Sequence, residues 1–316
     1  GEPNRGLNAM FVMMNEARLG VGMQSLGLAE AAYQNAVAYA RDRLQSRSAT
    51  GPKRPDKVAD PIIVHPDVRR MLLTAKAYVE GGRALTSWVA QQIDRELNHP
   101  DASVRAESAE LVALLTPIVK AFITDNAFET NVMMQQVFGG HGFIEEWGMS
   151  QYVRDARINM IYEGTNGIQA LDLLARKVLA DNGAKLQKFG AIVRDFAMAN
   201  GSDPAMQEFI APLADLGEKL GKLTMELAGK AMQNPDEVGA AAVPYLRVVG
   251  HLVYGYFWAR MARVALDKQG SGDSFYSTKL QTARFYFARL LPETAWQIRA
   301  ARSGADVLMA MDEAAF

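Results

Sequence analysis

Apolar residues recur at intervals of three and four along most of the chain, which is the spacing of amphipathic helices. Pro66 suits the first position of a helix, while Pro117 lies inside one and should kink or divide it, because proline donates no backbone hydrogen bond. Four helices are predicted in the first part of the chain, about residues 8–45, 66–98, 102–138 and 166–179, and a short segment near residues 149–157 leads to the last of them. Apolar positions of helical spacing that we expect to face the core include Met10, Met13 and Met23 in the first helix and Ile168 in the last.

The turn Asp181-Asn182-Gly183 is the best internal boundary in the sequence. The helices predicted beyond it cover about residues 184–200, 205–232, 234–268 and 274–311, the last broken at Pro292. Leucines alternately three and four residues apart form a coiled-coil-like seam: Leu213, Leu216, Leu220, Leu223 and Leu227. No stretch alternates for long enough to predict a strand. We therefore expect an all-α fold with one helical domain over residues 1–181 and a second over 182–316.

The composition is that of an ordinary soluble globular chain, with 49% hydrophobic and 22% charged residues among 316. A formal net charge of −1 argues against broad electrostatic binding to nucleic acid. The absence of cysteine excludes disulfides and thiolate chemistry and fits a cytoplasmic protein. The most apolar window, residues 238–266, contains Arg247 and His251, so we expect a buried helix there and no membrane span.

Glu163 is the strongest candidate for chemistry. It follows the apolar run Met160-Ile161-Tyr162, precedes Gly164, and stands at the entrance of a helix that Thr165 or Asn166 could cap. Burial raises the pKa of a carboxyl group, whereas a helix dipole and positive charge lower it, so this position suits a general base. An exposed first-turn glutamate is the alternative, and the local pattern alone favours it.

Three further patterns are ambiguous by themselves. Glycines in Phe138-Gly139-Gly140-His141-Gly142-Phe143 could cap a helix or admit an anionic ligand. The four histidines show no metal-ligand spacing, so we assign neither a metal site nor a catalytic role to them. A basic cluster could offset a helix dipole or bind phosphate, and it comprises Arg41, Arg43, Arg47, Lys53 and Arg54.

Taken in order, these motifs resemble the C-terminal helical domain of acyl-CoA dehydrogenases. The Phe-Gly-Gly-x-Gly-Phe turn, then Arg154-Asp155-Ala156-Arg157, then Tyr162-Glu163-Gly164-Thr165 follow the order of that family. The resemblance covers residues 1 to about 180 and implies an antiparallel, four-helix-bundle-like domain. Residues beyond 184 resemble the extra helical domain of long bacterial members, including those that act on 3-methylthiopropionyl-CoA. The opening Gly-Glu-Pro-Asn-Arg-Gly-Leu resembles the exit from a central β domain, so we expect a C-terminal fragment that is inactive alone.

The resemblance also implies roles for residues. Glu163 would remove a proton from the acyl α-carbon while FAD accepts the β-hydrogen as hydride, which yields a trans-2-enoyl-CoA. Gly164 would leave room for substrate, and Arg18 would lie near the thioester or CoA end. The residues implied to hold FAD are Arg43, Gln136, Gly139, Gly140 and Thr165, most of them from a neighbouring subunit.

That division of the site implies a homodimer or homotetramer. The resemblance also implies an acyl-CoA substrate and electron-transfer flavoprotein as partners. Some positions depart from the family pattern, such as Asn15 where a carboxylate is frequent, and these affect chain-length specificity. Three alternatives remain at this point: an acyl-CoA oxidase-like relative, a nitroalkane oxidase, and a non-catalytic oligomerisation module suggested by the leucine seam. Glu163 weighs against the nitroalkane oxidase, whose base is an aspartate.

Overall fold

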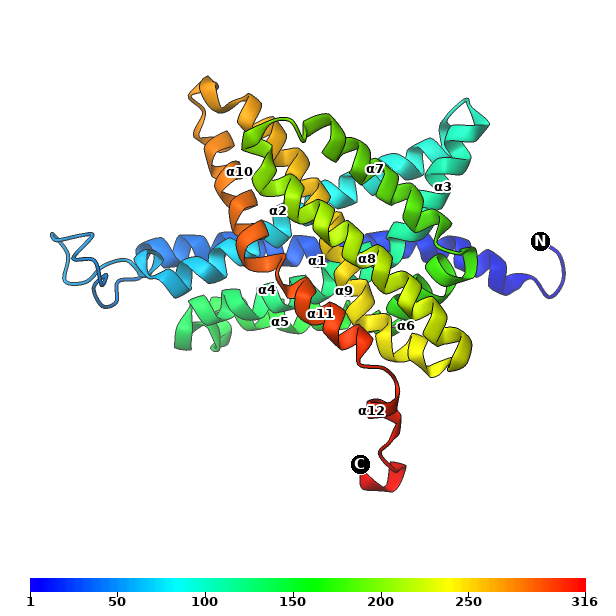
Figure 1. Ribbon diagram of the computed structural model, residues 1–316. Coiled ribbons are helices and arrows are strands. Elements are labelled where there is room, and N and C mark those ends of the chain that lie inside the picture. The colour runs from blue at the N-terminus through cyan, green and yellow to red at the C-terminus, as the bar shows by residue number, and fades with distance from the viewer.

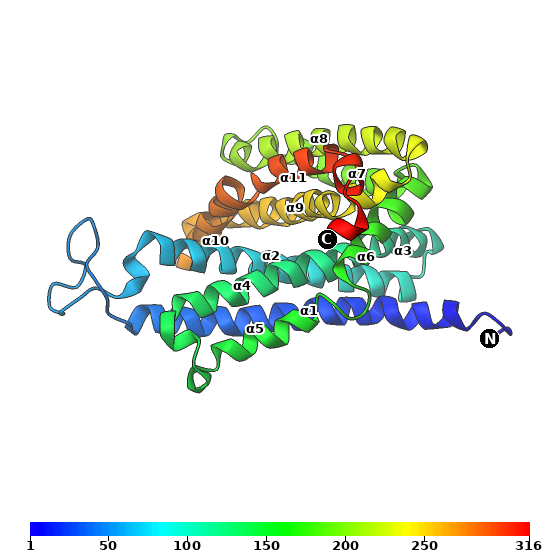
Figure 2. The same ribbon diagram turned by 90° about the horizontal axis from the view of Figure 1, so that it is seen from below.

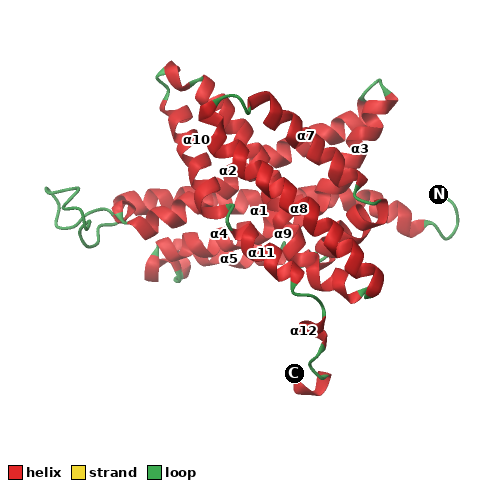
Figure 3. Cartoon of the chain, in the orientation of Figure 1, coloured by secondary structure: helices red, strands yellow, loops and turns green.

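The computed structural model describes residues 1–316, with the side chains of Asn8 and Val12 left out. Over those residues the chain is all-α, and loops without strands join the helices (Figure 3). The helices are α1 Gly6–Asp42, α2 Pro66–Asn98, α3 Ala102–Pro117, α4 Ile123–Val137, α5 Met149–Ile158, α6 Asn166–Leu171, α7 Ala184–Asn200, α8 Gln207–Gln233, α9 Asp236–Asp267, α10 Ser274–Phe285, α11 Glu293–Arg302 and α12 Asp306–Met309.

Pro117 does not divide the predicted third helix. A π-helical turn over Ile118–Phe122 follows the proline and joins α3 to α4 in one continuous helix. The proline lacks a backbone N–H, and the widened turn after it accommodates the lost hydrogen bond without a break. A second π turn, Asp172–Val178, extends α6. This π turn brings Leu173 and Leu174 into the core, while Ile168, predicted to be buried, is exposed.

The first part of the chain forms an antiparallel bundle in which α1 runs the length of the molecule (Figure 1). Figure 2 shows α1 and α5 along one side, α2 and α4 beside them, and α9 on the opposite side of α2 and α4. The buried apolar residues of α2 and the α3–α4 helix supply the centre of this bundle, and Leu85, Leu114 and Phe122 among them are fully buried. The bundle therefore gives α1 a rigid support on which functional side chains can be mounted.

Helix α9 is the central helix of the remaining part of the chain and packs against the bundle. A Cβ built on Gly250 would lie 2.3 Å from the Phe122 ring, so only glycine permits this approach. Nearby, the indole Nε1 of Trp258 donates a hydrogen bond to the carbonyl of Ala77 on α2 at 3.2 Å. One continuous hydrophobic core consequently includes residues of both parts of the chain.

A buried ion pair reinforces this packing. Arg247 on α9 binds both carboxylate oxygens of Glu293 at 2.8 Å and donates to Asn126 on α4 at 2.9 Å. His251 completes the cluster at 3.1 Å from Glu293. Burial alone would raise the pKa of Glu293, but hydrogen bonds from His251 and Arg247 hold it well below its ordinary value.

The leucine seam does not face an external partner. Its members, Leu213 to Leu227, are buried within the chain, where α8 packs on α9. The reason for predicting an oligomerisation module is therefore removed, because the same spacing serves an intramolecular helix pair.

One prediction about exposure is wrong and another is confirmed. Met10, Met13 and Met23 on α1, expected in the core, are 38, 63 and 52% exposed. Residues 238–266 lie in α9 and form a largely buried helix, as expected. Residues 102–137 form a helix long and apolar enough to cross a membrane, and 78% of its most apolar window is buried.

Candidate active site

The segment between α5 and α6 is a tight turn centred on Glu163. The φ of Glu163 is +58° and that of Gly164 is +82°, so two consecutive residues adopt the left-handed conformation. This conformation costs a residue with a side chain about 1–2 kcal/mol, and such strain is concentrated at functional sites. A Cβ at Gly164 would lie 2.6 Å from Nε2 of Gln169, so the turn also lacks room for a side chain there.

Two side chains fix the carbonyl of Glu163. Arg18 on α1 donates from Nε at 3.4 Å, and Gln169 on α6 donates from Nε2 at 3.5 Å. The Oε2 atom of Glu163 is buried without a hydrogen-bond partner among the described atoms. The backbone N–H of Glu163 likewise donates to no described atom. The turn thus presents a carboxylate oxygen and an N–H donor, both free to contact a ligand.

A buried polar cluster supports the turn from behind. Asn166, the first residue of α6, donates from Nδ2 to Asp125 at 2.6 Å and to Thr124 at 2.9 Å. Its Oδ1 accepts from Nζ of Lys120 at 2.7 Å, and Lys120 lies in the π turn, fully buried. Thr165 takes the N-cap position of α6 by its backbone only, since its exposed side chain makes no capping hydrogen bond.

The charges around Lys120 act in both directions. Burial lowers its pKa, Asp125 raises it, Arg18 lowers it and Glu163 raises it, with a resulting pKa of about 8. Burial likewise raises the pKa of Asp125, against hydrogen bonding by Asn166 and the charges of Arg247, Lys120 and Arg157. Lys120 and Glu163 are therefore electrostatically coupled.

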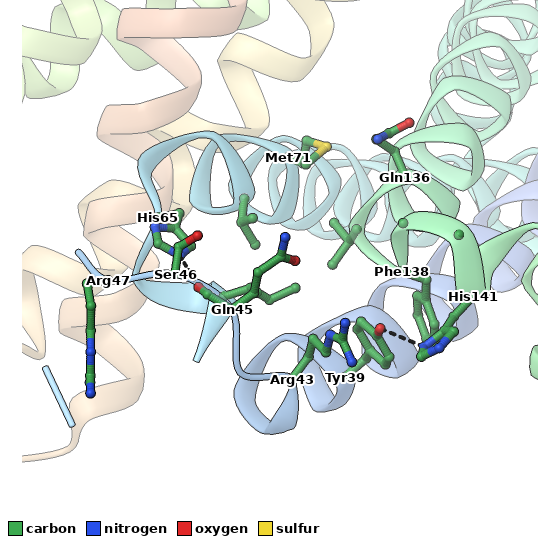
Figure 4. Close-up of a pocket in the computed structure, with 15 residues that line it drawn as sticks. Tyr39, Arg43, Gln45, Ser46, Arg47, His65, Met71, Gln136, Phe138 and His141 are labelled. Carbon is green, nitrogen blue, oxygen red and sulfur yellow. Dashed lines mark hydrogen bonds between the residues drawn. The ribbon is translucent and has the colours of Figure 1, made fainter. Parts of the chain in front are cut away.

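A second candidate site lies where α1 and α4 end. A cavity of about 710 Å³ opens between the end of α1, the Gly-rich turn after α4 and the loop before α2 (Figure 4). Four of the residues that the resemblance assigns to FAD line it: Arg43, Gln136, Gly139 and Gly140. The side chain of Arg43 makes no hydrogen bond or ion pair with the described residues, and no carboxylate lines the cavity. The arrangement suits an anionic ligand.

The loop beside this cavity is held by one buried carboxylate. Asp60 accepts hydrogen bonds from the backbone N–H groups of Ser48, Lys53 and Arg54 at 2.9, 2.8 and 2.7 Å. Arg47 donates to Asp60 and to the carbonyls of Arg54 and Lys57. Burial raises the pKa of Asp60, but the backbone donors outweigh it and lower the value to about 2. Arg47, a candidate phosphate ligand in the sequence, therefore stabilises the loop in which it lies.

Sequence reasoning missed an aromatic cluster at the edge of the same cavity. The Tyr39 hydroxyl hydrogen-bonds Nδ1 of His141 at 2.9 Å, and the Tyr39 ring stacks on Phe138 with centroids 4.1 Å apart. His141 stacks in turn on Trp147 at 4.8 Å. The sequence gives His141 no role because the histidines show no metal-ligand spacing, and its hydrogen-bond partner Tyr39 lies 102 residues away. Lys120 was overlooked too, although a single lysine in the apolar run 111–123 is an available signal.

The predicted site residues form two separate groups. Arg18, Glu163 and Gly164 meet at the turn, with Thr165 exposed beside them, whereas the residues around Arg43 gather at the cavity. Arg18 and Arg43 are 25 residues apart on α1, which corresponds to about 37 Å along a helix. The two groups therefore lie far apart within one chain.

The all-α fold, the strained Glu163 turn and the basic cavity together fit one family. A family model described as "Acyl-CoA dehydrogenase, C-terminal domain" matches residues 4–179, and one described as "Acetyl-CoA dehydrogenase C-terminal like" matches residues 183–312. The chain belongs to the acyl-CoA dehydrogenase family.

Individual relatives support this assignment. The chain is 41% identical to 3-methylmercaptopropionyl-CoA dehydrogenase of Ruegeria pomeroyi, covering 93% of this chain and 50% of that protein. Its fold is similar to Caenorhabditis elegans ACDH-11 in complex with C11-CoA (TM-score 0.73, 18% identity, 98% of this chain, 49% of that one). It is also similar to an acyl-CoA dehydrogenase complexed with FAD from Bacillus anthracis (TM-score 0.74, 19% identity, 92% and 49%). The chain spans about half the length of the curated relatives it matches.

Proposed function

We propose that this chain is the C-terminal helical part of an FAD-dependent acyl-CoA dehydrogenase that converts an acyl-CoA thioester to a trans-2-enoyl-CoA. The observation that carries the proposal is the Glu163 turn, where a buried carboxylate oxygen and a backbone N–H lie together without partners. Buried polar atoms are rarely left unpaired, so the carboxylate oxygen without a partner supports a role in contacting a ligand. The family assignment supports an oxidoreductase, and electron-transfer flavoprotein is the proposed acceptor.

The residues present fit FAD. A Cβ built on Gly139 or Gly140 would meet nothing within 4 Å, so the backbone at the cavity is open to close approach. Arg43 offers guanidinium donors to a diphosphate, and Gln136 lies at the same cavity. When bound, FAD supplies the hydride acceptor for the β-hydrogen.

The chain's own groups would act on the α-proton. The Glu163 carboxylate removes it as a general base, and the proton is transferred to Glu163 as the α,β double bond forms. The free N–H of Glu163 is available to stabilise negative charge on the thioester oxygen during that step. Arg18 and Gln169 hold the Glu163 carbonyl and so keep the N–H of the same residue oriented. Gly164 leaves the adjacent space without a side chain.

Because the two groups of residues lie far apart within one chain, we infer a homo-oligomer in which one chain supplies Glu163 and another supplies Arg43. We likewise propose that the chain divides into two domains between residues 181 and 182. We also propose that the protein is located in the cytoplasm. Titration of FAD into this chain alone should show weak binding or none. Purification of the chain with stoichiometric flavin would contradict the inference.

The decisive experiment uses the full-length polypeptide that contains this chain. Wild type should form 2-enoyl-CoA from an acyl-CoA and bleach its flavin anaerobically. Glu163→Gln should retain the flavin spectrum and lose about 10²–10⁴-fold in kcat, the usual contribution of a general base. Glu146→Gln, at an exposed glutamate on the segment before α5, is the matched control and should stay active. Normal turnover by Glu163→Gln would remove Glu163 from the mechanism.

A further inference from the structure

Lys120 is a buried charge that neither the proposed reaction nor the packing of the bundle explains. Its side chain lies in the core with 0% relative exposure, and its neighbours Val119 and Ala121 are apolar. An ammonium has three N–H donors, but Asn166 Oδ1 is the acceptor that the described residues provide. Burying an ammonium with so little compensation is costly, so a purely structural position would favour an apolar side chain.

Lys120 lies in a helix segment that is buried on every side. Residues 114–124 are all buried, a run that includes the π turn Ile118–Phe122 and extends beyond it in both directions. Wide π turns of this kind inside α-helices occur frequently at functional sites. A lysine at this position is therefore buried whichever way it points around the helix, and its ammonium must find its partners inside the protein.

From this position Lys120 reaches the catalytic turn through a single residue. Asn166 accepts from Lys120, donates to Asp125, and uses its backbone N–H to bind the carbonyl of Met160 at 3.1 Å. That last hydrogen bond closes the loop that contains Glu163, because residues 160 and 166 lie on either side of it. A contact that fixes the position of Asn166 therefore also fixes the turn that contains Glu163.

Resting on the function proposed above, we propose that Lys120 is a positioning residue for Glu163. It fixes the closed loop through Asn166. The charged groups that act on it are Asp125 from α4, Arg18 from α1 and Glu163 itself. Arg247 and Arg157 act on Asp125 from α9 and α5. Asp125 is bound by Asn166, and Arg18 donates to the Glu163 carbonyl, which leaves Lys120 as the fully buried cation of this cluster.

The test compares Lys120→Met with wild type in the full-length protein. Methionine is similar in length and has no charge. We expect kcat to fall about 10–100-fold with KM nearly unchanged, the size of effect that misplacing a reacting group produces. The thermal midpoint should not fall.

Lys279→Met is the matched control. Lys279 is also largely buried, 15% exposed, and pairs with Glu80 at 2.7 Å on the face between α2 and α10. It should lose stability without any change in kcat. If Lys120→Met behaves like Lys279→Met, with lower stability and an unchanged kcat, Lys120 is structural and the inference is wrong.

Amide hydrogen exchange separates this inference from the proposed function. In Lys120→Met, and in Asn166→Ala should the first variant not fold, the amide of residue 166 should lose protection relative to wild type and Lys279→Met. If wild type forms no enoyl-CoA, the proposed function fails while the exchange data still decide whether Lys120 holds the turn. Unchanged protection of the turn would overturn the inference even in an active enzyme.

Discussion

Arg18 and Glu163, 145 residues apart in the sequence, are joined by a hydrogen bond from the guanidinium Nε to the backbone carbonyl at 3.4 Å. Arg18 is anchored on its other side by Asn15, which accepts from Nη1 at 2.9 Å. The longest helix of the bundle is therefore connected directly to the strained turn. This gives Arg18 a role in holding the turn besides the substrate contact that the resemblance implies.

Replacing Arg18 by Met should lower kcat/KM of the full-length enzyme about tenfold. The reason is the loss of one charge-assisted hydrogen bond of about 1.5 kcal/mol, at the weak end because the contact is long. Steady-state kinetics on an acyl-CoA would measure it. Arg176→Met, which removes an exposed arginine paired with Asp172, is the control and should leave kcat/KM unchanged. Equal activities of the two variants would exclude this role for Arg18.

Gly164 and Gly167 provide a matched pair of alanine substitutions four residues or fewer from Glu163. At Gly164 the φ of +82° and the 2.6 Å approach to Gln169 predict a loss of about 1–2 kcal/mol in the free energy of unfolding. At Gly167, in the first turn of α6, a Cβ meets nothing within 4 Å, so alanine should be neutral or stabilising. Urea unfolding would compare them. Similar stabilities would show that the turn is not strained.

The loop that lines the cavity should depend on the ionised form of Asp60. Its pKa is about 2 in the fold against an ordinary value of 3.8, so its stabilisation is complete above about pH 4 and is lost as the pH falls towards 2. Asp60→Asn should remove the pH-dependent part at every pH, because the amide has no charge and only one oxygen that can accept from the backbone N–H groups. Hydrogen exchange at Ser48 and Arg54 would report the loss of protection. The control Asp56→Asn, on an exposed position of the same loop, should behave like wild type.

Gly250 and Gly239 form a second matched pair, both on α9. Alanine at Gly250 would place its methyl group 2.3 Å from the Phe122 ring, and overpacking of this kind costs about 1–3 kcal/mol. Alanine at the exposed Gly239 meets nothing and should stabilise the helix by about 0.5–1 kcal/mol. Thermal unfolding measures both. A stabilising Gly250→Ala would contradict the close packing of α9 on the π turn.

Local signals in the sequence were sufficient for the helices themselves. Pro66 begins α2 and Asn98 ends it as predicted, because the proline, the His99-Pro100 stop and the apolar stripe all act within a few residues. The resemblance singled out Arg43, Gln136, Gly139 and Gly140, which line one cavity, and their binding of FAD stays a prediction.

Features that depend on distant contacts could not be predicted from sequence. The π turns change which side of a helix faces the core, so Ile168 was assigned to the wrong face. The spacing of Leu213 to Leu227 is the same whether its partner is another chain or α9. Lys120 acquires its significance from Asn166, 46 residues away, which no local pattern reveals.

The pKa of Lys120 yields a final prediction about stability. Its value is about 8 in the fold against an ordinary 10.5, because burial disfavours the ammonium. Between those pH values the unfolded chain retains a proton that the folded chain has released, so this lysine makes the free energy of unfolding rise with pH from about 8 to about 10.5. Below pH 8 both states are protonated and the folded state bears the full cost of the buried charge. Lys120→Met lacks this titration.

Wild type should therefore become more stable relative to Lys120→Met as the pH increases from about 7 to about 10. Urea unfolding across that pH range measures the free energy of unfolding of both proteins. Subtracting one value from the other removes the contribution of titrating groups that the two proteins share. Lys279→Met retains Lys120 and should retain the rise. Parallel pH profiles for wild type and Lys120→Met would mean that Lys120 keeps an ordinary pKa, and that its ammonium is better solvated than its burial in the π turn implies.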